Sequence, residues 1–284
     1  MKTSYHVGIA ATGMVLPKKK YSNQDIIERI KKATKDKKEI PELKAEWIEE
    51  NIGIKDRYFF GDEELLVDVS AQACEQALQK ASWQASDLDF IIFSSISTHC
   101  ETGSMVIPSS ACLTQEKLQA YHAFAYDTSA ACSGWTYGMA QGIALIESGM
   151  CSKGAVICSE KQLKGLDFSN HISSVLIGDI ATATLIEKTP QAKTQGVFLQ
   201  ANNKKNLSDI ITLPYFSTEE NKGAAIGFFD LKGRSVFKEG TQTMTELTIK
   251  ALKDNKLTSS DVSWFIYHQA NGAMLRRVGK KVGI

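Results

Sequence analysis

The sequence has no long hydrophobic run and almost no net charge, and each absence excludes a class of protein. No window approaches the ~20 consecutive apolar residues that a membrane-spanning helix requires. Residues 1–13 lack the charged start, apolar stretch and cleavage pattern of a signal peptide. With 33 Lys plus Arg against 32 Asp plus Glu, the chain is no polyelectrolyte, so nucleic-acid binding would need a local patch. We therefore expect a cytoplasmic protein with neither a membrane nor a nucleic-acid partner.

Metal-binding and disulfide patterns are also missing. The six cysteines include no CxxC pair, and the five histidines form neither an HExxH motif nor a cluster with cysteine. Structural zinc sites use such spacings, so we expect no bound metal. A disulfide framework is not expected in a cytosolic chain of 284 residues, so most of the thiols are expected to be small buried hydrophobic groups.

The composition is that of a globular protein, with 43% hydrophobic and 23% charged residues over a length that suits two domain-sized units. Short apolar runs alternate with helical patterns, which favours a layered α/β fold. The runs that predict strands are Val7–Thr12, Phe90–Ser95, Ala123–Asp127, Ala155–Ser159, Thr182–Ile186, Gly196–Gln200 and Trp264–Tyr267. The runs at Phe90, Ala155 and Trp264 lack polar alternation, as strands buried on both faces do.

Residues 127–149 predict a helix that is apolar on nearly every side and is therefore buried all round. Cys132 lies where the preceding strand gives way to this helix, among small residues. The N-terminus of a helix stabilises a thiolate, so this position predicts a lowered thiol pKa. The pattern alone leaves two interpretations open, a packed core thiol and a nucleophile.

A second candidate site follows the hydrophobic run Trp264–Tyr267. His268 ends this run, and Asn271 opens an amphipathic helix. Open α/β sheets bind their ligands at the carboxyl ends of strands, where such side chains would lie. His268 is then either a structural histidine with satisfied hydrogen bonds or the partner of Cys132 in a Cys–His pair.

Several motifs follow one another in a fixed order along the chain. They are Gly8–Pro17, Glu46–Ile48 with Gly53-Ile54, Pro108–Cys112, Asp127–Trp135, Gly178-Asp179, Gly233–Lys238 and His268–Asn271. Together they resemble the β-ketoacyl-acyl-carrier-protein synthase III family of thiolase-like enzymes. The resemblance implies an α/β fold of two pseudo-duplicated halves in five α-β-α-β-α layers. The halves would be residues 1–188, with the nucleophilic cysteine, and residues 189–284, with the catalytic histidine.

The resemblance also implies a reaction, a decarboxylative Claisen condensation of an acyl-coenzyme A primer with malonyl-acyl carrier protein. Cys132 would hold the acyl group as a thioester, and His268 would donate a hydrogen bond to the thioester carbonyl of the malonyl extender. The acyltransferase would serve fatty-acid initiation or a related pathway. It would need no metal or redox cofactor and would act as a homodimer.

Further residues match positions that bind substrate in the family. Trp47 would stack on the adenine of coenzyme A, although a core position is an alternative, and Gly233, Phe237 and Asn271 would line the pantetheine tunnel. An exposed basic face would attract an acidic carrier protein. Its residues would be Arg276, Arg277, Lys280 and Lys281, extended by Lys238, with a solvated helix face as the alternative. Gln269 would also contact the carrier protein.

The chain departs from the family pattern in three places. Asn51 and His171 occupy positions near the adenine site where the family has arginine, and Gly178–Thr182 lacks two of the family's glycines. The family's catalytic asparagine and Gly-rich loop would follow Ile284, so we expect the chain to be C-terminally incomplete. These departures keep two alternatives open, a thiolase-fold acyltransferase of secondary metabolism with another acceptor, and an inactive fragment that binds the carrier.

Overall fold

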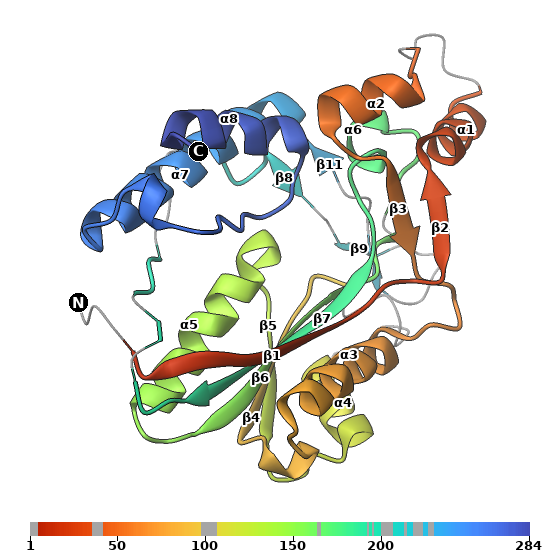
Figure 1. Ribbon diagram of the computed structural model, residues 1–284. Coiled ribbons are helices and arrows are strands. Elements are labelled where there is room, and N and C mark those ends of the chain that lie inside the picture. The colour runs from red at the N-terminus through yellow and green to blue at the C-terminus, as the bar shows by residue number, and fades with distance from the viewer. Residues whose placement is uncertain are drawn as a thin grey trace. The chain divides into compact units, whose positions relative to one another are not determined.

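The computed structural model divides the chain into two compact units (Figure 1). It describes residues 5–35, 42–97, 107–163, 166–191, 193–194, 196–199, 207–212, 215–217, 224–226 and 230–284. Unit 1 consists of Met1–Lys19, Tyr58–Leu163 and Asp179–Val197, and unit 2 of Lys20–Arg57, Lys164–Gly178 and Phe198–Ile284. Each unit therefore combines segments that are distant in the sequence. The two halves 1–188 and 189–284 are a different division of the chain and stay a prediction from the resemblance.

Unit 1 is built on a five-stranded sheet with the order β1-β7-β6-β4-β5. In that order the strands are Val7–Val15, Ile180–Lys188, Lys153–Glu160, Phe90–Ser94 and Phe124–Thr128. Strand β4 runs parallel to both β5 and β6, whereas β7 is antiparallel to β6 and β1. The carboxyl ends of β4, β5 and β6 therefore meet the start of β7 at one end of the sheet. Five of the predicted strands are confirmed.

Helices cover both faces of this sheet. Helices α3 (Leu66–Ala81) and α4 (Ser110–Leu118) lie on one face and α5 (Gly134–Glu147) on the other (Figure 1). All five residues of β4 are buried, as the unbroken apolar run predicts, because α3 and α4 cover one face and α5 the other. A short 3-10 turn, η1 (Ala85–Asp87), leads into β4.

Helix α5 is buried on one side only, so the prediction of a helix buried all round is wrong. Its glycines, together with Met139, Ile143 and Ile146, press against the sheet. Trp135 and Tyr137 remain 46% and 37% exposed, respectively. No described element of unit 1 covers this outer face, and apolar composition alone could not reveal that.

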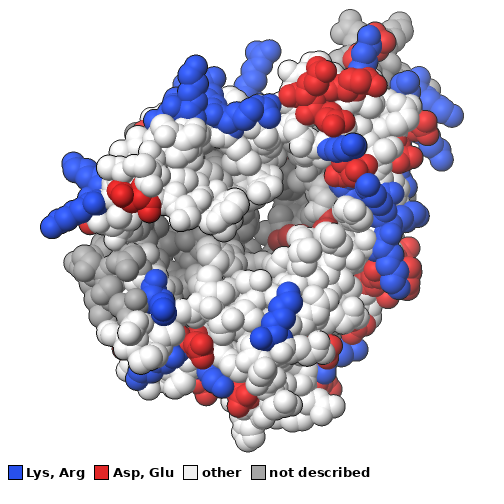
Figure 2. All heavy atoms as spheres, viewed as in Figure 1, with Lys and Arg blue, Asp and Glu red and all other residues white. Residues whose placement is uncertain are grey.

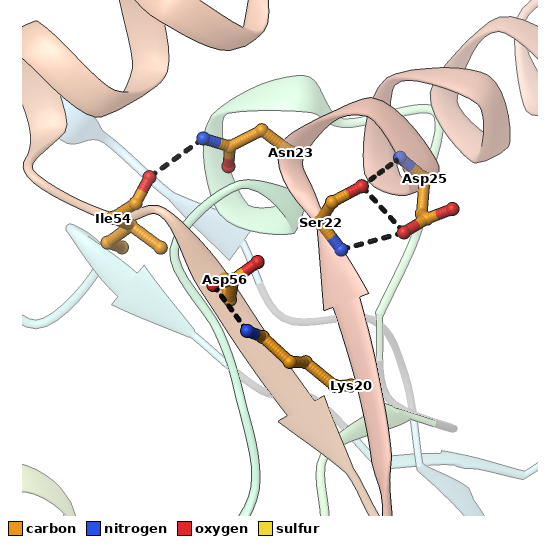
Figure 3. Close-up of polar contacts among 6 residues, drawn as sticks. All are labelled: Lys20, Ser22, Asn23, Asp25, Ile54 and Asp56. Carbon is orange, nitrogen blue, oxygen red and sulfur yellow. Dashed lines mark hydrogen bonds and ion pairs between the residues drawn. The ribbon is translucent and has the colours of Figure 1, made fainter.

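Strands β2 (Lys19–Ser22) and β3 (Asp56–Phe59) form a two-stranded sheet, of which Lys20–Ser22, Asp56 and Arg57 belong to unit 2. An ion pair joins the two strands, with Lys20 Nζ 2.8 Å from Asp56 Oδ2 (Figure 3).

Helix α1 (Asn23–Ala33) begins with a capping box. The Ser22 hydroxyl accepts the Asp25 N–H, and the Asp25 carboxylate accepts the Ser22 N–H at 2.7 Å (Figure 3). Such a pair satisfies two backbone donors that the first helical turn leaves free. Asn23 Nδ2 donates to the Ile54 carbonyl at 2.8 Å and so ties the helix to the chain that enters β3.

The buried guanidinium of Arg57 links three segments of unit 2. One of its nitrogens, Nη2, lies 2.9 Å from both Asn23 Oδ1 and the Val175 carbonyl oxygen. Val175 ends α6 (His171–Ser174), so α1, β3 and α6 converge on one side chain. Burial lowers the pKa of Arg57 to about 10.

Further described elements of unit 2 are helices and small two-stranded sheets. They are α2 (Ala45–Ile52), α7 (Gly233–Asp254), α8 (Gly272–Val282), β8 (Ile211–Thr212) paired with β11 (Asp230–Leu231), and β9 (Tyr215–Ser217) paired with β10 (Ala224–Ile226). Helix α8 packs against α7 and also contacts α2. A 3-10 turn, η4 (Ser259–Asp261), separates α7 from the segment that leads to α8.

Two predicted strands are absent. Of the predicted strand Gly196–Gln200, residues 196–199 are not in a strand and Gln200 lies outside the described residues. Trp264–Tyr267 is not in a strand either. This second segment is also not buried on both faces, because Trp264 and Ile266 are 83% and 90% exposed. Its side chains alternate as in a strand, but no described segment pairs with its backbone. Among the described residues, no helix has the length and apolar character needed to cross a bilayer.

Candidate active site

Cys132 lies at the end of the unit 1 sheet where the parallel strands terminate. It belongs to a 3-10 turn, η2 (Ala131–Ser133), between β5 and α5. Ala131 adopts a positive φ of 44°, a conformation that costs a residue with a side chain about 1–3 kcal/mol. Such strain is concentrated at functional sites, and here it precedes the predicted nucleophile.

Cys132 as a residue is exposed to solvent, but the pKa of its thiol is raised, so the prediction of a lowered pKa is wrong. The surrounding protein atoms desolvate the thiolate, and the charge of Glu160 adds to the effect. A backbone hydrogen bond from its own N–H opposes the shift without cancelling it. Cys132 precedes α5 in a separate 3-10 turn, so the helix N-terminus is not where the sequence pattern put it.

Glu160, at the end of β6, is the centre of a polar cluster beside the thiol. Its carboxylate accepts the Ile96 N–H at 3.0 Å, the Gln162 amide at 2.9 Å and the hydroxyls of Ser95 and Ser97. Desolvation nevertheless raises the pKa of Glu160, although these hydrogen bonds lower it. The cluster is therefore a carboxylate held rigidly by four donors.

Asp179 is a second buried carboxylate at this end of the sheet, immediately before β7. Its oxygens accept the Gln162 N–H at 2.7 Å and the Phe60 N–H at 2.9 Å. Burial raises its pKa to about 6, although these hydrogen bonds and the charge of Lys161 act in the opposite direction. Asp179 thus links the residue that follows β3 to the segment that follows β6.

Sequence reasoning missed Ser95, Ser97, Glu160 and Gln162. A signal was available, because polar residues follow directly after the two most apolar strands, β4 and β6. Parallel strands bring their carboxyl ends together, so these residues could have been grouped with Cys132.

His268 belongs to unit 2, in the extended segment before α8. The residue retains solvent exposure, but desolvation lowers the pKa of its imidazole and so favours the neutral form, which has one N–H donor. Asn271 is the N-cap of α8, and its side-chain oxygen accepts the Met274 N–H at 2.7 Å. Asn271 therefore fixes the start of the helix that follows the histidine.

The predicted basic face is present on α8. Arg276, Arg277, Lys280 and Lys281 are exposed, whereas Met274 and Val278 are buried. Figure 2 shows blue cations over α8 and red carboxylates over the neighbouring α2. The guanidinium of Arg277 lies over the ring of Phe237 on α7, 5.9 Å from its centroid.

The other predicted binding residues are distributed over unit 2. Trp47, on α2, is 52% exposed, so a core position is excluded within the described structure. Gly233 is the first residue of α7, and Lys238 and Gln269 are exposed. Asn51 turns back on its own helix, where its amide donates to the Trp47 carbonyl at 3.0 Å. Within the described ranges, no three His, Cys, Asp or Glu side chains gather as metal ligands would.

Comparisons with known proteins agree with one another. The family described as 3-oxoacyl-[acyl-carrier-protein (ACP)] synthase III matches residues 126–204, the segment that includes Cys132 and Asp179. A β-ketoacyl-[acyl-carrier-protein] synthase III from Helicobacter pylori is 32% identical over 257 residues, which cover 88% of this chain and 75% of that protein.

Solved structures give the same result for the fold. A 3-oxoacyl-[acyl-carrier-protein] synthase III from Aquifex aeolicus superposes with a TM-score of 0.76 at 28% identity, over 98% of this chain and 81% of that one. The priming β-ketosynthase of the R1128 polyketide pathway has a TM-score of 0.79 at 20% identity, over 100% and 80% of the two chains. The thiolase-like α/β fold that the sequence predicts is therefore confirmed.

Proposed function

Because the chain belongs to the β-ketoacyl-[acyl-carrier-protein] synthase III family, we propose that it condenses an acyl-coenzyme A primer with malonyl-acyl carrier protein. The reaction is a decarboxylative Claisen condensation that passes through an acyl-Cys132 thioester. It forms a 3-oxoacyl-carrier thioester, the product that starts a fatty-acid chain.

The first half-reaction transfers the acyl group to Cys132. The Cys132 thiolate attacks the carbonyl carbon of the acyl-coenzyme A thioester, a new C–S bond forms, and coenzyme A leaves as a thiol after taking up a proton. The positive φ of Ala131 and the close approach of α5 to β4 at Gly134 support this role, because they fix the position of the sulfur.

The second half-reaction forms the carbon–carbon bond. The neutral imidazole of His268 donates a hydrogen bond to the malonyl thioester carbonyl while the C–CO₂⁻ bond breaks, and the electron pair is delocalised onto that oxygen. The enolate carbon then attacks the acyl-Cys132 carbonyl, and the Cys132 thiolate leaves. A single donor to such an oxyanion is worth roughly 10²–10³ in rate. Decarboxylation itself supplies the carbanion, so the reaction needs no metal or redox cofactor.

The observation that supports the proposal most directly is the solvent-exposed Cys132 at the ligand-binding end of the sheet. Intact mass after incubation with acyl-coenzyme A tests it. We expect one acyl adduct per chain, mapped to Cys132, and none in Cys132→Ala, whose circular dichroism spectrum should be unchanged. Equal labelling of wild type and variant would disprove the proposal.

His268 is tested by separating the half-reactions. We expect His268→Ala to acquire the acyl adduct at a rate close to wild type while release of carbon dioxide from malonyl-acyl carrier protein falls about a hundredfold or more, the scale of a lost oxyanion donor. Loss of acylation in the same variant would show that His268 acts on the thiol instead.

The substrate-binding and assembly roles complete the proposal. Trp47 stacks on the adenine of coenzyme A, and Gly233, Phe237 and Asn271 line the path of the pantetheine arm. An acidic carrier protein docks on the basic face of α8. The protein acts in the cytoplasm as a homodimer. The dimer is supported by the edge strand β5, where Phe124 is 45% exposed, and light scattering of the purified protein measures the mass.

Asn51 and His171 favour a second candidate function, an acyltransferase of secondary metabolism that uses another acceptor. The polyketide priming synthase has the same fold, so the fold is compatible with this alternative but does not favour it. Turnover of one acyl donor against malonyl-acyl carrier protein and against other thioester acceptors separates the two. Clear release of carbon dioxide would also exclude the hypothesis that the protein is an inactive fragment that only binds the carrier.

A further inference from the structure

Two adjacent arginines of α8 are directed to different elements of unit 2. Arg277 lies over the Phe237 ring on α7, whereas Arg276 reaches α2, where its Nη2 donates to the Glu50 carbonyl at 3.3 Å. The basic face of α8 is therefore not one uniform surface. Arg276 differs from the other three cations because it touches the helix that contains Trp47.

Two glycines permit this contact. Helix α2 ends at Gly53, whose φ of +83° is a left-handed helix cap, and α8 begins at Gly272. A Cβ on Gly53 would lie 3.1 Å from the Gly272 Cα, and a Cβ on Gly272 would lie 3.2 Å from both the Ile52 carbonyl oxygen and Arg276 Nη1. The helix ends thus touch backbone to backbone, and the guanidinium covers the contact.

The contact places a cation where α2 has none. The charged residues within α2 are Glu46, Glu49 and Glu50, all acidic. Trp47 and Glu50 are three residues apart and are therefore neighbours on the helix surface. An anion beside Trp47 would meet only like charge from α2 itself, so its counter-ion has to come from another element. Arg276, on α8, is bound to the last turn of α2, where a cation also interacts favourably with the dipole of α2.

The guanidinium keeps donors for a ligand. It has five N–H groups, and the contact with Glu50 uses one nitrogen. The side chain is exposed and forms no ion pair with any described carboxylate. A planar fork of this kind suits bidentate hydrogen bonding to a phosphate group.

We propose that Arg276 binds a phosphate of the nucleotide part of coenzyme A, whose adenine stacks on Trp47. The proposal rests on the proposed function and refines it. Arg276 serves the acyl donor and not the carrier protein, and supplies the positive charge that Asn51, bonded back to its own helix, does not provide. Arg277, Lys280 and Lys281 remain for the carrier.

The test compares acyl donors with and without the nucleotide. Initial rates are measured for Arg276→Gln with acyl-coenzyme A, with acyl-3′-dephospho-coenzyme A and with acyl-pantetheine. We expect KM for acyl-coenzyme A to rise about tenfold to a hundredfold with kcat nearly constant, as for a lost charged hydrogen bond. KM for acyl-pantetheine should not change. Arg276→Lys should recover part of the loss.

The dephospho donor identifies the phosphate. If Arg276 binds the 3′-phosphate, the variant and wild type will have the same KM for this donor, and if it binds the diphosphate, the difference will persist. Lys253→Gln, which removes an exposed cation at the far end of α7, is the control and should match wild type. Arg277→Gln should instead raise KM for malonyl-acyl carrier protein.

An equal rise in KM for acyl-pantetheine, or an effect confined to the carrier, would overturn the assignment of Arg276. Failure of the wild-type protein to form any acyl-enzyme would instead refute the proposed function. Calorimetric titration with adenosine 3′,5′-bisphosphate then still tests Arg276, because binding of this nucleotide requires no turnover and should weaken about tenfold or more in Arg276→Gln.

Discussion

Ser94 and Gly134 approach so closely that no side chain fits between them. A Cβ on Gly134 would lie 2.0 Å from the Ser94 hydroxyl oxygen and 3.0 Å from its Cβ. Ser94 ends β4 and Gly134 begins α5, two residues after Cys132. This contact fixes the distance between the end of β4 and the start of α5. It therefore also fixes the position of the Cys132 thiol relative to the sheet.

Gly134→Ala should therefore move the start of α5. We expect a loss of about 1–3 kcal/mol in the free energy of unfolding, the usual cost of overpacking, and slower acylation of Cys132. Urea denaturation and intact mass measure the two effects. Ser94→Gly removes the colliding hydroxyl, so the double variant should recover most of both losses. Additive losses in the double variant would contradict the prediction.

The raised pKa of Cys132 predicts an unusual pH profile. A free cysteine has a pKa of about 8.5, so we expect the alkylation rate of Cys132 by iodoacetamide to reach half its maximum at a higher pH. Glu160→Gln should lower this midpoint, because it removes a negative charge that disfavours the thiolate. Peptide mapping distinguishes Cys132 from the other thiols. A midpoint below that of free cysteine would restore the prediction made from the sequence.

Asp179 should make the protein less stable as the pH rises. Its folded pKa of about 6 exceeds the unfolded value of about 3.9. The stabilisation is present below pH 4 and is lost as the pH rises through 6, by on the order of 3 kcal/mol. Asp179→Asn has no proton to lose, so its denaturation midpoint in urea should fall less than that of wild type between pH 4 and 7. If the urea midpoints of wild type and Asp179→Asn changed equally between pH 4 and 7, the pKa of Asp179 would not be raised in the folded protein.

Gly13 allows helix α3 to lie directly on β1. A Cβ there would be 2.0 Å from the Ala73 carbonyl oxygen and 2.9 Å from the Ala77 nitrogen, both of them backbone atoms that cannot rotate away. Gly13→Ala should lower the free energy of unfolding by about 1–3 kcal/mol. The matched substitution Gly279→Ala, within α8, meets only ordinary contacts at 3.4 Å and should raise the melting temperature slightly. An unchanged free energy of unfolding in Gly13→Ala would contradict the prediction, because it would mean that α3 can move away from β1 without destabilising the fold.

Sequence reasoning succeeded where a pattern reports a local property. The apolar runs at Phe90 and Ala155 predicted strands buried on both faces, and the amphipathic pattern after Asn271 predicted α8, in which Met274 and Val278 are buried. The order and spacing of the motifs along the chain predicted the family. These features depend on hydrophobicity along one segment and hardly on its neighbours.

It failed where the outcome depends on what surrounds a segment. The run at Trp264 resembles a buried strand, but burial needs a pairing partner, and no described segment supplies one. The thiol pKa depends on desolvation and on Glu160, which is 28 positions away in the sequence. The contact of Arg276 with α2 likewise joins residues 226 positions apart, a distance across which helical periodicity has no information.

The interleaving of the two units has a consequence for how the chain reaches its native state. The polypeptide passes from one unit to the other five times, after residues 19, 57, 163, 178 and 197. Helices α1 and α2 leave the ribosome early, yet α8, the helix that packs on α2, begins at Gly272, 220 residues after α2 ends at Ile52. The contact between α2 and α8 therefore cannot form until α8 has been synthesised, and the part of α2 that α8 covers stays exposed to chaperones or proteases until then.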